Sequence, residues 1–130
     1  MNGSVRRVVV TGSQGYIGSV LTESLLSEGY EVHGRDLGLY HRCRYPAGVS
    51  AFEPWDARTA EKADFEGFDA VVYLAALSDD PLGDLDPALT YEINHFATAK
   101  AAEMAKAAGV SRFVFASSCS LYGVSGEDGL

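Results

Sequence analysis

Near the start of the chain, a β-branched run leads into a glycine-rich turn and then into a helical pattern. Residues 5–11 have the composition of a buried strand, and the next residues, TGSQGYIGS, place a glycine at every third position. Beyond the turn, apolar residues recur with helical spacing at Ile17, Val20, Leu21 and Leu25. A strand joined to a helix by a tight glycine turn is a typical opening unit of an α/β fold.

The rest of the chain continues this alternation. Strand patterns follow at residues 30–36, 49–55, 68–77 and 111–117. An alanine-rich helix is predicted over residues 87–109, with proline at its start and glycine at its end. Strands alternating with helices pair in parallel through right-handed crossovers. We therefore expect residues 1–123 to form a Rossmann-type, doubly wound α/β domain, with about five parallel strands and helices on both faces, and residues 124–130 to form a mobile tail.

Composition excludes several classes of partner. The net charge of -8 argues against nucleic acid or an anionic membrane surface, and no apolar run is long enough to span a bilayer. The two cysteines lack Cys-x-x-Cys spacing, and His33, His41 and His95 lack metal-ligand spacing, so no metal is expected. The N-terminal apolar run is too short for a signal peptide. These features favour a cytoplasmic protein in which any bound phosphate is held by backbone groups.

The glycine turn suits a diphosphate. Glycine permits positive φ and removes a Cβ that would keep a pyrophosphate away, and the N-terminus of the following helix offers unpaired N–H groups. The candidate cofactor-binding residues here are Gly12, Gly15, Tyr16, Ile17 and Gly18. A glycine triplet can also be purely structural, so a dinucleotide site depends on the context of the turn.

That context includes an acid about twenty residues further on. Asp36 ends the second predicted strand, where a carboxylate can accept hydrogen bonds from both ribose hydroxyls. Such a carboxylate would repel a 2'-phosphate, which favours NAD over NADP as the cofactor. Arg35 leaves NADP open, because a neighbouring guanidinium could pair with that phosphate. A solvated turn acid is the alternative for Asp36.

Several further motifs follow in order: RDL around Asp36, DAR at 56–58, LAAL at 74–77, Asn94 in the long helix, and SSCSLYG at 117–123. Together with the glycine turn, they resemble the extended short-chain dehydrogenase/reductase family, the NAD-dependent epimerases and dehydratases of nucleotide sugars. The resemblance covers essentially the whole chain, as the N-terminal cofactor half of a protein normally more than twice as long. The fold is therefore expected to be truncated relative to the family.

The resemblance implies roles for individual residues. Asp56 would contact adenine through its side chain and Ala57 through its backbone. Ala75, Ala76 and Leu77 would form a wall of small and apolar residues beside the adenosine and pyrophosphate, and Leu74 of the same motif is a further cofactor-binding candidate. Asn94 would orient the cofactor or brace that wall, with a water-facing helix residue as the alternative. Ser118 would be the catalytic serine that hydrogen-bonds the reacting sugar hydroxyl, which makes a nucleotide sugar a candidate partner.

One family motif is missing from these 130 residues. The family's base is a tyrosine in a Tyr-x-x-x-Lys helix, where the lysine lowers the tyrosine pKa. None of Lys62, Lys100 and Lys106 stands four residues after a tyrosine. Whether the chain is an enzyme therefore stays open. It could be the NAD-binding domain of an epimerase or dehydratase, a non-catalytic cofactor-binding, scaffold or assembly module, or a fragment of a longer product.

The fifth predicted strand has a consequence for assembly. Without a neighbouring strand and covering helix, Val114 and Phe115 would leave an open sheet edge and an apolar face. We therefore expect a homo-oligomer, or a partner chain that covers this edge.

Overall fold

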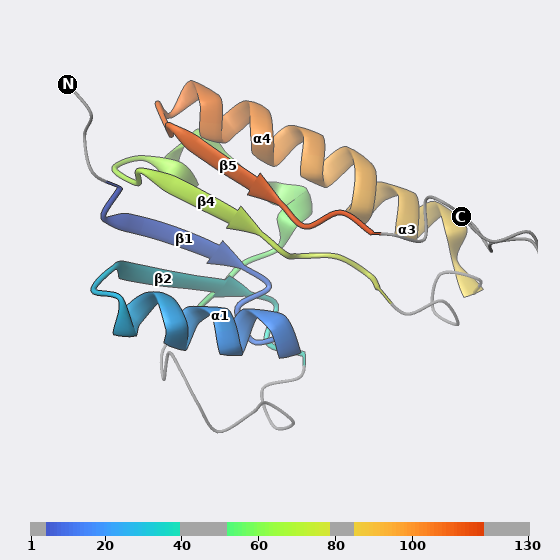
Figure 1. The fold of residues 1–130 in the computed structure, drawn as a ribbon. Coiled ribbons are helices and arrows are strands. Elements are labelled where there is room, and N and C mark those ends of the chain that lie inside the picture. The colour runs from blue at the N-terminus through green and yellow to red at the C-terminus, as the bar shows by residue number, and fades with distance from the viewer. Residues whose placement is uncertain (1–4, 40–51, 79–84, 119–130) are drawn as a thin grey trace, which may run out of the picture.

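A computed structural model describes residues 5–39, 52–78 and 85–118 of the chain. Five strands form one parallel sheet in the order β3-β2-β1-β4-β5. They are β1 (Arg7–Thr11), β2 (Glu31–Asp36), β3 (Phe52–Pro54), β4 (Ala70–Tyr73) and β5 (Arg112–Phe115). All of the pairings are parallel, and Figure 1 shows the strands pointing the same way. The predicted Rossmann-type fold class is confirmed.

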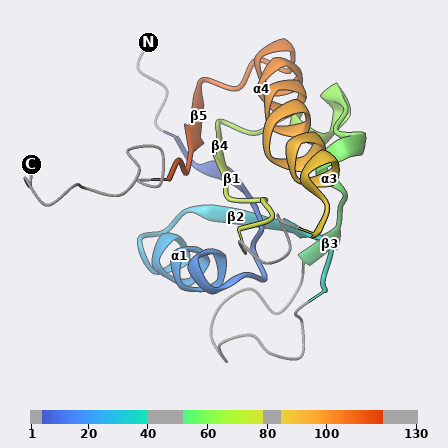
Figure 2. The ribbon, with the colours of Figure 1, turned by 90° about the vertical axis from the view of Figure 1, so that its right-hand side faces the viewer.

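Helices cover both faces of the sheet. Helix α1 (Tyr16–Ser27) lies on one face, and α3 (Pro87–Tyr91), the π-helical η3 (Glu92–Ala97) and α4 (Thr98–Ala107) lie on the other (Figure 2). Two short 3-10 helices, η1 (Ala57–Thr59) and η2 (Lys62–Phe65), follow β3. Among the described residues, no helix combines the length and apolar character needed to cross a bilayer.

Each face of the sheet has its own core, because successive strand residues point to opposite faces. Val8 and Val10 lie in the core on the α1 side, whereas Val9 lies in the core on the α4 side. The α4 side is the larger and includes Trp55 and Phe65. Three small residues at helical spacing let the helix approach the sheet closely: Ala97, Ala101 and Ala105.

Three elements differ from their sequence patterns. The apolar run at 68–77 is a strand only as far as Tyr73, and the rest of it lines the carboxyl edge of the sheet. The predicted helix at 87–109 contains the π-helical segment η3 and ends at Ala107. In α1, Ile17 is 63% exposed, and the buried residues are small ones: Gly18, Ser19 and Thr22.

Strand β5 forms one edge of the sheet. Val114 is 54% exposed and Phe115 is 51% exposed, as expected for an uncovered strand. That a second copy or a partner chain covers this edge stays a prediction. The proposed tail at 124–130, together with Tyr122, Cys43 and His41, lies outside the described residues.

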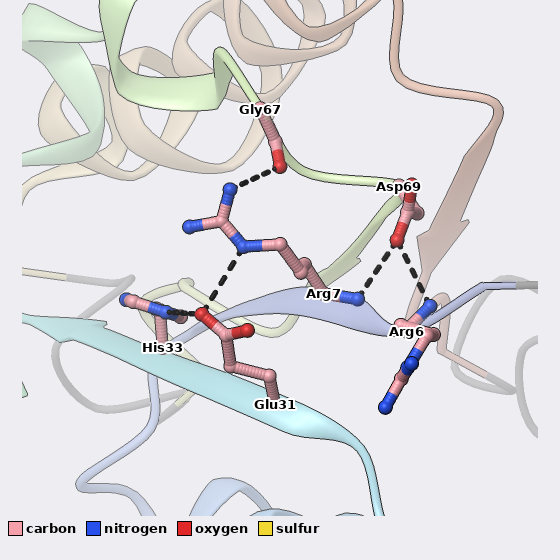
Figure 3. Close-up of polar contacts among 6 residues, drawn as sticks. All are labelled: Arg6, Arg7, Glu31, His33, Gly67 and Asp69. Carbon is pink, nitrogen blue, oxygen red and sulfur yellow. Dashed lines mark hydrogen bonds and ion pairs between the residues drawn. The ribbon is translucent and has the colours of Figure 1, made fainter.

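The amino edge of the sheet is held by a polar cluster (Figure 3). Asp69 Oδ2 accepts hydrogen bonds from the backbone N–H groups of Arg6 (2.9 Å) and Arg7 (2.8 Å). The Arg7 guanidinium donates to Glu31 (3.1 Å) and to the backbone carbonyl of Gly67 (2.6 Å). These bonds join the starts of β1 and β2 to the segment that enters β4.

The Asp69 cluster predicts a particular acid sensitivity. The backbone N–H groups of Arg7 and Arg6 hold the pKa of Asp69 below its ordinary value of 3.8. A depressed folded-state pKa contributes stability above the unfolded value, and that contribution is lost as the pH falls through the folded pKa. Asp69→Asn should therefore be less stable than the wild type at pH 6, and the difference should close below pH 3.8. Urea unfolding between pH 3 and pH 7 measures this, and a gap that persists unchanged at pH 3 would contradict it.

Candidate functional site

The predicted site residues come together at the carboxyl edge of the sheet. All five strands run in parallel, so the segments that follow them meet at this edge, which Figure 2 shows. The order β3-β2-β1-β4-β5 reverses direction between β1 and β4. In open α/β sheets, ligands bind in the crevice at such a switch point. The surface depression lined by Arg6, Arg7, Gly29, Glu31 and Asp69 lies at the opposite edge and is not part of this site.

The glycine turn sits in direct contact with the segment after β4. Gly12 has a φ of 71°, a conformation that favours glycine. A Cβ placed on Gly12 would lie 3.0 Å from the backbone of both Leu74 and Ala75. The first glycine therefore allows both the turn and its close packing against the predicted wall.

The third glycine lets α1 begin directly against the turn. A Cβ on Gly18 would lie 2.1 Å from the carbonyl oxygen of Gly12 and 2.8 Å from Ser13 Cα, and both of these are backbone atoms. No side chain other than hydrogen fits there without movement of the turn or the helix. Gly15 caps the helix and provides no side-chain hydrogen bond.

The start of α1 is electrostatically suited to an anion. Its hydrogen-bond ladder begins with Ser19 N–H donating to Gly15 O (2.9 Å), so the N–H groups of Tyr16, Ile17 and Gly18 have no carbonyl one turn earlier in the helix. The first turn contains no acidic residue. Tyr16 and Ile17 are exposed, at 78% and 63%. The positive end of the helix dipole is therefore accessible.

Asp36 lies beside this turn, at the end of β2. Its Oδ2 accepts a hydrogen bond from Gln14 N–H (3.0 Å), and its Oδ1 accepts one from Gly38 N–H (2.7 Å). Each carboxylate oxygen has a second lone pair that can accept another hydrogen bond. The structure thus orients a partly exposed carboxylate next to the helix start, which does not match a freely solvated turn acid.

Arg35 points to the other face of the sheet. Its side chain is only 9% exposed and pairs with Glu53 (3.1 Å) and Asp64 (3.2 Å). The guanidinium therefore lies on the face of the sheet opposite to the Asp36 carboxylate. The alternative in which Arg35 meets a 2'-phosphate receives no support from this geometry.

Two residues of this edge had no role in the sequence interpretation. The buried Thr11 Oγ1 accepts hydrogen bonds from Leu74 N–H (3.2 Å) and Ala75 N–H (3.3 Å), which joins the ends of β1 and β4. A Cβ on Gly34 would lie 2.7 Å from Ser13 Oγ, so Gly34 makes room for the turn. A glycine inside a strand is a sequence sign of such close approach, whereas the pairing of Thr11 had no sequence sign.

Asp56 and Ala57 follow β3 at the same edge. Asp56 caps η1, and both of its carboxylate oxygens accept hydrogen bonds from Arg58, the shortest being 2.6 Å from Arg58 Nη2. These bonds lower the pKa of Asp56. The side chain of Ala57 is buried in the core. Only the backbone of Ala57 remains for a ligand, which agrees with the backbone role predicted for it.

Asn94 braces the wall. Its Oδ1 accepts a hydrogen bond from Leu77 N–H (2.8 Å), and its Nδ2 donates to Leu77 O (2.7 Å). Asn94 lies within η3, and π-helical turns of this kind are frequent at functional sites. The bracing alternative therefore matches the structure, and the water-facing alternative does not. A direct contact between Asn94 and a cofactor stays a prediction.

Ser118 lies at the same edge, three residues after the end of β5. It is exposed and is the last residue that the structure describes. Its predicted contact with a sugar hydroxyl is consistent with this place and stays a prediction. Among the described residues, no three His, Cys, Asp or Glu side chains are grouped to hold a metal ion.

Comparison with known proteins identifies the family. The sequence matches the NAD dependent epimerase/dehydratase family over residues 8–129. The chain therefore belongs to this family, as the ordered motifs indicated.

Individual relatives agree with this assignment. A UDP-glucose 4-epimerase of Streptomyces lividans is 34% identical over 125 residues, which cover 90% of this chain and 37% of that protein. A D-erythronate dehydrogenase of Haemophilus influenzae is 32% identical, with 90% of this chain and 39% of that protein covered. The crystal structure of a Thermus thermophilus UDP-glucose 4-epimerase in complex with NAD has a TM-score of 0.74 and 32% identity, and the match covers 86% of this chain and 37% of that one. The chain thus spans less than half the length of these relatives.

Proposed function

We propose that the chain binds NAD at the carboxyl edge of its sheet, as the cofactor-binding part of a nucleotide-sugar epimerase or dehydratase. The observation that carries the proposal is the Gly12–Gly18 contact, in which a Cβ on Gly18 would lie 2.1 Å from Gly12 O. This contact places the open start of α1 directly over the end of β1. Backbone N–H groups at such a helix start hold a pyrophosphate.

The residues present fit the two parts of the adenosine half of this cofactor, its ribose and its adenine. The backbone N–H groups of Gln14 and Gly38 orient the Asp36 carboxylate, which accepts hydrogen bonds from the hydroxyls of the adenosine ribose. Asp56, with its pKa lowered by Arg58, stays ionised and accepts a hydrogen bond from the amino group of adenine. The Asp36 carboxylate, with Arg35 held on the other face, favours NAD over NADP.

The relatives, which include an epimerase and a dehydrogenase, support hydride transfer as the reaction class at this site. The chemistry that NAD would supply at this edge is a hydride acceptor for the carbon that bears a sugar hydroxyl. In this chain, Ser118 orients that hydroxyl by a hydrogen bond, and Asn94 holds the wall at Leu77 in place. The proton of the hydroxyl needs a base, which in this family is the tyrosine of Tyr-x-x-x-Lys.

A non-catalytic role is favoured by one observation. None of the three lysines within these 130 residues follows a tyrosine at the required spacing. The loss of a positioned acid/base group costs about a hundredfold to ten-thousandfold in rate. The chain by itself would then bind the cofactor as a sensor, scaffold or assembly module. Turnover of UDP-sugars by these 130 residues would exclude that role.

The cofactor proposal can be tested with the single tryptophan of the chain. Trp55 immediately precedes Asp56, so bound NADH should accept excitation energy from its indole. Titration with NADH should give a saturable signal that Gly15→Val weakens, because a branched side chain would crowd the capping position. The absence of heat with NAD and NADP in calorimetry, together with no energy transfer, would overturn the proposal.

A further inference from the structure

An ionic cluster around the buried Arg35 side chain lies next to the proposed adenosine end of the site; its Glu53 side chain is 67% exposed and its Asp64 side chain 24%. Arg35 is on β2, and its guanidinium lies 3.1 Å from Glu53 Oε2 and 3.2 Å from Asp64 Oδ1. Trp55 Nε1 donates a hydrogen bond to Asp64 Oδ2 (3.1 Å), which also accepts one from Glu61 N–H (2.8 Å). Asp64 therefore binds three groups from three different segments of the chain.

The two side chains that Asp64 contacts, Arg35 and Trp55, each belong to a residue that immediately precedes a proposed adenosine contact. Arg35 immediately precedes Asp36, the proposed ribose contact, and Trp55 immediately precedes Asp56, the proposed adenine contact. Trp55 N–H also donates to Asp36 O (2.9 Å), so the two dipeptides are joined through their backbones as well. Asp64 thus contacts the side chains of the two residues that immediately precede the proposed adenosine contacts.

Stability alone does not account well for this cluster. The Arg35 side chain is 9% exposed, and its Nε has no hydrogen-bond partner among the described residues. Its Nη1 is within ion-pair distance of Asp64 but lacks hydrogen-bond geometry. Replacing buried ion pairs with apolar residues is often neutral or stabilising, and a buried polar atom without a partner calls for another explanation.

We infer that Asp64, through its contacts with Arg35 and Trp55, is a positioning residue that sets the specificity of the dinucleotide site for adenine. This inference rests on the proposed NAD site. Asp64 does not touch the cofactor itself. It holds Trp55, and with it the neighbouring Asp56 carboxylate, at the place where that carboxylate meets the adenine amino group.

The inference is tested by comparing NAD with its hypoxanthine analogue, deamino-NAD. Adenine presents an amino donor where hypoxanthine presents a carbonyl acceptor, so a correctly placed Asp56 carboxylate should favour NAD by about tenfold. Asp64→Asn has a single acceptor oxygen, which can face either Arg35 or the donors Trp55 Nε1 and Glu61 N–H, so the side chain can no longer hold Arg35 and Trp55 together. The preference for NAD should fall by about threefold or more. Isothermal titration calorimetry gives both dissociation constants.

Two further variants define the outcome. Arg35→Met breaks the same pair from the other side, so it should also lower the preference, and the double variant should lower it no further. Glu66→Gln is the matched control, because it also removes one negative charge near η2. Glu66 forms an exposed i,i+4 ion pair with Lys62, so this variant should leave the preference for NAD unchanged. In the ligand-free protein, Asp64→Asn should also increase the quenching of Trp55 fluorescence by acrylamide, because the indole loses its hydrogen bond to Asp64.

The contrary results are distinct. Equal weakening of both dinucleotides in Asp64→Asn, with an unchanged preference, would show a purely structural role and overturn the inference alone. The same conclusion follows if the wild type binds both dinucleotides equally, or if neither single variant folds. A wild type that binds neither dinucleotide would overturn the proposed function, and the inference with it.

Discussion

Gly18→Ala is expected to lower the free energy of unfolding by about 3 kcal/mol or more and to abolish dinucleotide binding. The added Cβ would lie 2.1 Å from Gly12 O, 2.8 Å from Ser13 Cα and 2.9 Å from the carbonyl carbon of Gly12. All three are backbone atoms in the turn, so no side chain can rotate away. Either α1 shifts or the turn opens, and both changes displace the N–H groups that face the pyrophosphate.

Two other glycines provide matched controls for this variant. At Gly29 a Cβ would meet nothing within 4 Å, but the φ of 85° is unfavourable for alanine, so Gly29→Ala should cost about 1 kcal/mol without affecting affinity. At Gly15 the nearest atom to an added Cβ would be Gly12 O, 3.3 Å away, and φ is -72°. This contact is only slightly too close, so Gly15→Ala should lower the free energy of unfolding by about a few tenths of a kcal/mol. Urea unfolding followed by circular dichroism measures all three. If the Gly18→Ala protein is as stable as the Gly15→Ala protein, the turn accommodates the added Cβ by a small shift and the prediction is wrong.

The same glycines show why this part of the fold was predictable. A turn that needs a positive φ at Gly12 and no side chain at Gly18 leaves a local sequence pattern. The parallel sheet was predictable because strand patterns alternate with helical patterns along the sequence. Asp36 was found because its distance from the turn follows from the length of one helix and one strand.

Other features of the site depend on contacts between distant segments and leave no local pattern. Arg35 was a candidate phosphate contact because it neighbours Asp36. The two residues are consecutive in β2 and therefore point to opposite faces, whereas the pairing of Arg35 with Asp64, 29 positions further along the chain, has no local sequence sign. The hydrogen bond between Leu77 and Asn94 spans 17 positions, and Asn94 lies in the π-helical segment η3, which helical spacing does not predict. Helical spacing predicted an apolar face for α1 through Ile17, but the close approach at Gly18 selects small residues for the contact and leaves Ile17 exposed.

Asp36→Asn should weaken NAD binding by about tenfold to a hundredfold, because hydrogen bonds to a charged group contribute about 1.5–3 kcal/mol. The Asp36 carboxylate accepts from Gln14 N–H and Gly38 N–H, one on each oxygen. In asparagine, one oxygen becomes an amino group that faces one of these donors. The side chain therefore turns away or loses a backbone contact, and the ribose hydroxyls lose an ionised acceptor in both cases.

The effect on NADP separates recognition of the ribose from general damage to the site. The wild-type carboxylate would repel a 2'-phosphate, and Asp36→Asn removes that repulsion. Affinity for NADP should therefore fall much less than affinity for NAD, or rise. Glu23→Gln removes one charge from an exposed position of α1 and should change neither dissociation constant. If calorimetry finds equal losses for both dinucleotides in Asp36→Asn, the carboxylate only shapes the turn, and the choice between NAD and NADP is made elsewhere.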